Sequence, residues 1–94
     1  MCIKKYKKRN GIKTRDLDTK FLLYDYKEGL LMELNGSAKY IWLLIGTKPF
    51  EEIISDYSQH YGIDPIMATD DVTNVIADLK TKNFIEEEDE LCSS

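Results

Sequence analysis

The hydrophobic positions in the first half of the chain occur in short runs that are typical of β-strands. Residues 21–26 are rich in aromatic and aliphatic side chains, residues 30–34 are almost entirely apolar, and Gly29 marks a turn between them. Residues 14–18 form a weaker extended segment. We therefore predict a hairpin of the two stronger strands within a three-stranded antiparallel meander.

Alternation along the last of these strands places three apolar side chains on one face: Leu30, Met32 and Leu34. The other face would carry Leu31 and Glu33, and we expect Phe21 and Leu23 of the neighbouring strand to add apolar surface there. Since the solvated face of an antiparallel sheet is normally polar, this second face is expected to be covered.

The second half of the chain has helical periodicity. A short helix is expected to begin after a cap at Asn35 or Ser37 and to end at Gly46. A second helix follows, with Pro49 in its first turn and apolar residues every three or four positions, and stops at Gly62.

A third helix is predicted from a cap at Asp64 to about Lys82. Its core-facing stripe consists of four apolar residues: Ala68, Val72, Ile76 and Leu79. Beside that stripe, a second line along the helix contains Asp71, Val75, Asp78 and Lys82. Two interpretations of this line stay open: Val75 is the edge of the core, or this flank lines a shallow groove with charges at its rim.

Charge is unevenly distributed along the chain. Residues 1–20 contain eight basic and two acidic residues, whereas residues 86–90 are all acidic. We expect residues 1–12 to be a basic, disordered arm, 13–86 to be the folded domain, and 87–94 to be an acidic, disordered tail. The arm could instead contact an acidic partner. Nucleic acid is a disfavoured partner, because the body of the domain is acidic.

The strand over residues 30–34 is expected to lie at the edge of the meander, since nothing strand-like follows it. A sheet edge offers unpaired N–H and C=O groups, and this one carries Glu33 as its only charged residue. An apolar edge beside a helix can accept a peptide as an added strand. Pairing of two such edges in a homodimer is an alternative.

The sequence contains no recognisable catalytic or metal-binding motif. His60 is the only histidine, and Cys2 and Cys92 lie at opposite ends of the chain without the spacing of a zinc site. We predict that the protein is not an enzyme, has no catalytic residues and needs no metal or cofactor. No run approaches the roughly 20 apolar residues of a membrane span, so a cytoplasmic protein without a membrane partner is expected.

The order and spacing of these features resemble the PqqD-like family. The resemblance spans about residues 13–86, and it departs from the family pattern at Asn83, where a glycine is usual. The segments that carry it are Leu23-Tyr24-Asp25, Gly29, Leu34-Asn35, Ala38, Ile41-Trp42, Phe50-Glu51-Glu52-Ile53, Tyr61-Gly62-Ile63-Asp64, Asp71-Val72, Leu79 and Phe84-Ile85.

This resemblance implies a winged-helix-like α+β domain, with a three-stranded antiparallel sheet followed by three helices. Such domains are recognition elements for ribosomally synthesised and post-translationally modified peptides (RiPPs). They are peptide chaperones in natural product biosynthesis that bind the leader segment of a precursor peptide by strand addition. They present it to a modifying enzyme, commonly a radical S-adenosylmethionine (radical SAM) enzyme.

The resemblance also implies where the leader peptide binds. The implied peptide-binding residues are Leu30, Leu31, Met32, Glu33 and Leu34 of the edge strand, and Asp71, Val75, Asp78, Leu79 and Lys82 of the third helix. The competing hypotheses are a DNA-binding winged-helix protein and a homodimerising interaction module that binds no peptide.

Overall fold

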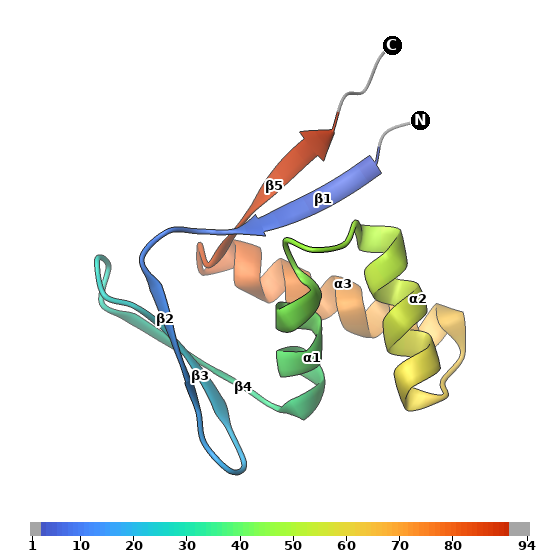
Figure 1. Cartoon of the computed structure of the whole chain (residues 1–94), viewed down its shortest axis with the longest axis horizontal. Helices are drawn as coiled ribbons and strands as arrows, with labels where there is room; N and C mark the ends of the chain where they lie inside the picture. Colours follow the sequence, from blue (N-terminus) through green and yellow to red (C-terminus); the bar gives the residue numbers. More distant parts are fainter. Residues whose placement is uncertain (1–2, 91–94) are drawn as a thin grey trace.

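A computed structural model of the chain describes residues 3–90, and within that range the chain forms five strands and three helices (Figure 1). In chain order they are β1 (Ile3–Lys8), β2 (Ile12–Asp16), β3 (Phe21–Asp25), β4 (Leu30–Leu34), α1 (Gly36–Leu44), α2 (Phe50–Tyr61), α3 (Pro65–Thr81) and β5 (Ile85–Glu90). Strands β2, β3 and β4 form an antiparallel sheet that the three helices follow. The α+β fold predicted from the sequence is therefore confirmed.

The turn between β3 and β4 is stabilised by Asp25, whose side chain is 5% exposed. Its carboxylate accepts the backbone N–H of Lys27 at 3.0 Å, and its carbonyl accepts the N–H of Gly29 at 2.7 Å. Gly29 has a φ of 71°, in the left-handed region that a glycine adopts without strain. This turn pairs Asp25 with Leu30 and so sets the register of the whole hairpin.

The sheet faces differ from the sequence-based expectation. Phe21 lies opposite Leu34 and Leu23 lies opposite Met32, so the apolar β3 residues share the buried face instead of the face of Leu31. The expectation was wrong because the register depends on the number of turn residues, and a shift of one residue moves every side chain to the other face.

Local capping signals determine where the helices begin and end. The Asn35 side chain accepts the N–H of Ala38 at 2.9 Å, and Asp64 accepts the N–H of Ile66 at 2.8 Å. Gly62 ends α2 in the left-handed conformation, and Asn83 follows α3 with a φ of 62°. The three predicted helices are thus confirmed, with boundaries within about two residues.

The core lies between the inner sheet face and the three helices. Residues without solvent exposure come from β3, from each helix and from the segment after α3: Leu23, Ile41, Ile53, Val72, Leu79 and Phe84. Trp42 of α1 is 3% exposed and joins this cluster. The predicted inward stripe of α3 is confirmed in full, since all four of its members are buried.

Residues 3–8 and 85–90 form strands in the structure, whereas the sequence analysis expected residues 1–12 and 87–94 to be disordered. β1 pairs antiparallel with β5 in a separate two-stranded sheet, which Figure 1 shows at the top of the molecule. Tyr6 is 5% exposed and packs edge-to-face on Phe50, with ring centroids 6.0 Å apart. Residues 1–2 and 91–94 of the expected arms lie outside the described residues.

Opposite charge complements the burial of Tyr6 in this pairing. The Lys7 and Arg9 side chains lie 3.5 Å and 3.3 Å from the Glu86 carboxylate, and the Arg9 N–H donates to the Phe84 carbonyl. Each charged run by itself is typical of a solvated tail. Together, with a buried tyrosine between the charges, they form a ladder in which each strand offsets the charge of the other.

Truncation of Trp42 tests the position of the core. We expect Trp42→Ala to lower the free energy of unfolding by about 3–5 kcal/mol, because a buried aromatic leaves a cavity. The matched control is Leu43→Ala, since the neighbouring Leu43 is 51% exposed and should cost under about 1 kcal/mol. Equal denaturation midpoints for the two variants would contradict this core.

Truncation of Tyr6 tests the β1–β5 pairing. We expect Tyr6→Ala to destabilise the protein by about 3 kcal/mol in urea denaturation, because its ring is buried against Phe50. Lys7→Ala removes only an exposed ion pair and should cost less than about 1 kcal/mol. A Tyr6→Ala variant as stable as the parent would mean that β1 is detached in solution.

Candidate functional site

A groove of about 350 Å³ lies between β4 and α3. Met32, Glu33 and Leu34 line it from the strand. The helix contributes Asp71, Asn74, Val75 and Asp78, and the remaining lining includes Ala38 of α1 and Tyr57 of α2. The structure thus places a hollow between the two walls that the sequence analysis selected.

The strand wall of this groove is the edge of its sheet. The strand order is β2-β3-β4, so β4 pairs with β3 on one side, and no other strand of the described residues pairs with its second side. Leu30 and Leu31 are 41% and 61% exposed there. An edge with open N–H and C=O groups and apolar side chains can accept a further extended segment.

The helix wall of the groove is formed by one line of α3 residues. Val75 is half-buried against the core and also lines the groove, so this residue is both the edge of the core and part of the groove wall. Asp71 and Asp78 lie on either side of Val75 along the chain, and both are exposed. The wall therefore offers a strip of apolar surface bounded by two carboxylates.

Tyr57 holds one of these carboxylates in place. Its hydroxyl donates a hydrogen bond to Asp71 Oδ2 at 3.1 Å. Burial raises the pKa of the Tyr57 phenol, and the hydrogen bond to Asp71 raises it further. The hydrogen bond therefore orients the Asp71 carboxylate at the groove wall.

The remaining residues predicted to bind a peptide lie elsewhere. Leu79 has no exposed surface and belongs to the core. Lys82 is exposed at the end of α3 and is not part of the groove lining. Sequence reasoning missed Tyr57 and Ala38, because their positions in apolar helical stripes signal only burial.

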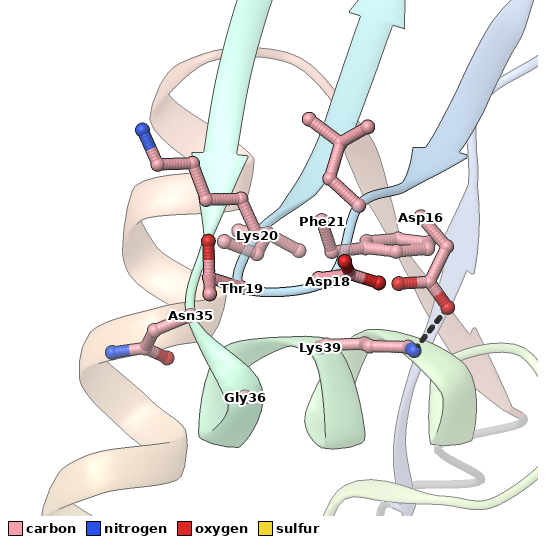
Figure 2. A pocket seen from close by; sticks show the side chains of 10 residues that line it. Asp16, Asp18, Thr19, Lys20, Phe21, Asn35, Gly36 and Lys39 are labelled. Atoms are coloured by element: carbon pink, nitrogen blue, oxygen red, sulfur yellow. Dashed lines mark hydrogen bonds and ion pairs between the residues drawn. The ribbon is translucent and has the colours of Figure 1, made fainter.

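A smaller hollow of about 160 Å³ lies where the β2–β3 turn meets α1 (Figure 2). Lys39 extends along it, with its Nζ 2.6 Å from Asp16 Oδ2 and 5.3 Å from the ring centroid of Phe21. These contacts tie the hairpin to the helix that follows β4.

The described residues show neither a metal cluster nor a membrane helix. No group of three or more His, Cys, Asp or Glu side chains among them is placed to hold a metal ion. None of their helices is long and apolar enough to cross a bilayer. His60 stacks on Tyr40 with ring centroids 4.2 Å apart, which is a packing contact, and both cysteines lie outside the described residues.

Comparison with known proteins identifies the family. The family model of coenzyme PQQ synthesis protein D (PqqD) matches residues 20–85, which run from β3 to the start of β5 and include both walls of the groove. The chain therefore belongs to the PqqD family, as the sequence features indicated. No curated protein is significantly similar to the chain in sequence.

Two solved structures share the fold. The chain is similar to TbiB1 in complex with the TbiA(beta) leader peptide, with a TM-score of 0.77 and 22% identity over 85% of this chain and 94% of that one. It is also similar to lasso peptide synthetase B1 complexed with the leader peptide, with a TM-score of 0.77 and 19% identity over 87% of this chain and 98% of that one.

The Tyr57–Asp71 hydrogen bond predicts a pH dependence of stability. A tyrosine whose pKa is raised by folding contributes stability that is fully present below about pH 10 and lost as the pH rises through the folded-state pKa. We therefore expect the wild-type free energy of unfolding to fall more steeply between about pH 9 and pH 11 than that of Tyr57→Phe.

Urea denaturation at several pH values measures this difference. Tyr26→Phe is the matched control, because it removes the hydroxyl of a tyrosine that is 52% exposed. Parallel pH profiles for the wild type and Tyr57→Phe would contradict the burial of this phenol.

Proposed function

We propose that this protein is a peptide chaperone that binds the leader segment of a ribosomally synthesised precursor peptide as a strand added to β4. The observation that carries the proposal is the open β4 edge beside the groove of α3. An extended peptide there would gain main-chain hydrogen bonds from the strand and side-chain contacts from the groove.

The comparisons support this proposal in two ways. The chain belongs to the PqqD family, and the match includes both walls of the groove. Both solved neighbours were bound to leader peptides. At 22% and 19% identity they establish a common fold, and the peptide partner is transferred here as an inference.

The proposed contact surface follows from the exposure of each residue. Leu30–Leu34 would supply the strand edge, and Val75 would pack on the peptide between Asp71 and Asp78. Leu79 would support this wall from inside the core, and Lys82 would flank its end. A short added strand buries a small interface, so a dissociation constant of about 1 μM, or roughly −8 kcal/mol, is expected.

The chaperone would present the bound peptide to a modifying enzyme, for which we propose the radical SAM class, and would act in the cytoplasm without catalysing a reaction itself. This partner rests on the family alone. The proposal predicts that a radical SAM enzyme is encoded beside this protein, and size-exclusion chromatography of the two proteins mixed together tests their association. Separate elution of the two at micromolar concentration would contradict the pairing.

The competing functions are less consistent with the groove. A DNA-binding winged helix would need α3 in a groove lined with phosphates, yet Asp70, Asp71 and Asp78 on this helix are exposed and repel phosphate. A homodimer through paired β4 edges would occupy the same edge as a peptide. It would appear as a dimer in size-exclusion chromatography that peptide addition converts to monomers.

Filling the groove tests the proposed function. Peptides selected from a phage library of random 12-residue sequences are expected to bind the wild type at about 1 μM in calorimetry. Val75→Trp should weaken this binding more than tenfold, because the indole occupies the space beside β4. The matched control is Thr69→Trp, since Thr69 is exposed on α3 outside the groove lining.

Strand addition also has a signature in amide hydrogen exchange. Bound peptide should slow exchange of the β4 amides that point away from β3, since these gain hydrogen bonds. Unchanged β4 exchange in the complex, or equal affinity of Val75→Trp and Thr69→Trp, would contradict peptide binding at this edge.

A further inference from the structure

The charged residues that line the groove are all acidic: Glu33, Asp71 and Asp78. From this we infer that the groove selects leader peptides that place lysine or arginine side chains on the face that packs against α3. This inference rests on the proposed function, and it names the chemistry that distinguishes a cognate leader from other extended peptides.

The two α3 carboxylates are exposed and lack a cationic partner within residues 3–90. Asp71 accepts only the neutral hydroxyl of Tyr57 among the contacts described, and Asp78 lies in no ion pair there. By contrast, Glu33 already pairs with Lys20, with 3.3 Å between Nζ and Oε1. The acidic field in the groove therefore comes mainly from Asp71 and Asp78.

The apolar surface between these carboxylates favours a basic side chain with a long stem. Val75 and Met32 are both half-buried and face each other across the groove lining. A lysine or arginine can lay its methylene groups on such apolar surface while its charged head reaches outward to a carboxylate. An acidic peptide side chain in the same place would be repelled by both aspartates.

The spacing of the carboxylates exceeds the repeat of an extended peptide by about 4 Å, a distance that flexible basic side chains can span. Seven helical residues separate Asp71 from Asp78, which is about 10 Å along the axis. Alternate residues of a strand lie on one face and are about 6.6 Å apart. Two basic residues at alternate peptide positions, with their flexible stems, can therefore reach both carboxylates at once.

Selection from the same phage library tests the inference. We expect peptides selected on the wild type to be enriched in lysine or arginine at alternate positions. Selection on the double variant Asp71→Asn and Asp78→Asn should lose that enrichment. Asp70→Asn is the matched control, because Asp70 is an exposed α3 aspartate outside the groove lining. Peptides selected on this variant should show the same enrichment in basic residues as those selected on the wild type.

The affinities of two synthetic peptides measure the size of the preference for basic residues. One is the peptide selected most often on the wild type, and the other has its basic residues replaced by glutamine. The wild type should bind the basic peptide about 4- to 25-fold more tightly, at about twofold to fivefold for each carboxylate. The Asp71→Asn and Asp78→Asn variant should bind both peptides equally, and the wild-type preference should shrink in 0.5 M salt.

The outcomes separate this inference from the proposed function. Selected peptides that bind in the groove but are neutral or acidic, or a double variant that retains the preference for the basic peptide, would overturn the charge selection and leave the function standing. Failure to select any peptide, or selected peptides that bind Val75→Trp as tightly as the wild type, would overturn both.

Discussion

The unpaired backbone N–H and C=O groups along one side of β4 are the feature on which the proposed binding site depends. Each residue of an edge strand carries N–H or C=O groups that need a partner, either water or another chain. β4 leaves this edge open while its apolar residues anchor it, with Leu34 buried in the core. Directly after Leu34, Asn35 caps α1, so the strand cannot shift without disturbing the helix.

The basic N-terminal strand β1 finds its hydrogen-bonding partner away from β4. β1 pairs with β5 instead of extending the three-stranded sheet, and Figure 1 shows it turning away from that sheet before β2 begins. Lys7 of β1 and Arg9, which follows the strand, lie beside Glu86 of β5. Burial of Tyr6 and these ion pairs hold the two terminal segments together in a sheet of their own, separate from the β4 edge.

Local signals made most of the fold predictable from the sequence. Asn35, Asp64 and Asn83 act within one helical turn, and the inward stripe of α3 follows from the helical period alone. The pairing of β1 with β5 was not predictable in this way, because the two strands lie at opposite ends of the chain. The sheet face of Phe21 was missed because it depends on the number of residues in the turn.

The parts of the candidate site that lie within one helix or one strand could be predicted from the sequence. The line through Asp71, Val75 and Asp78 is visible in the periodicity of α3, and its position opposite β4 required only the order of the strands. Tyr57 could not be found, since its hydroxyl reaches Asp71 only after α2 and α3 pack together. Helix packing therefore adds to the groove a residue that the sequence marks only as apolar.

Main-chain hydrogen bonds from a peptide to β4 would supply affinity without distinguishing one peptide sequence from another, because every non-proline residue carries the same donor and acceptor. A domain that binds by strand addition must therefore choose its partner through the side chains beside the strand. The fold persists at 22% and 19% identity in its structural neighbours, so most side chains differ between these proteins while the fold stays the same. In this chain the charge of Asp71 and Asp78, which line the groove beside β4, would make that choice.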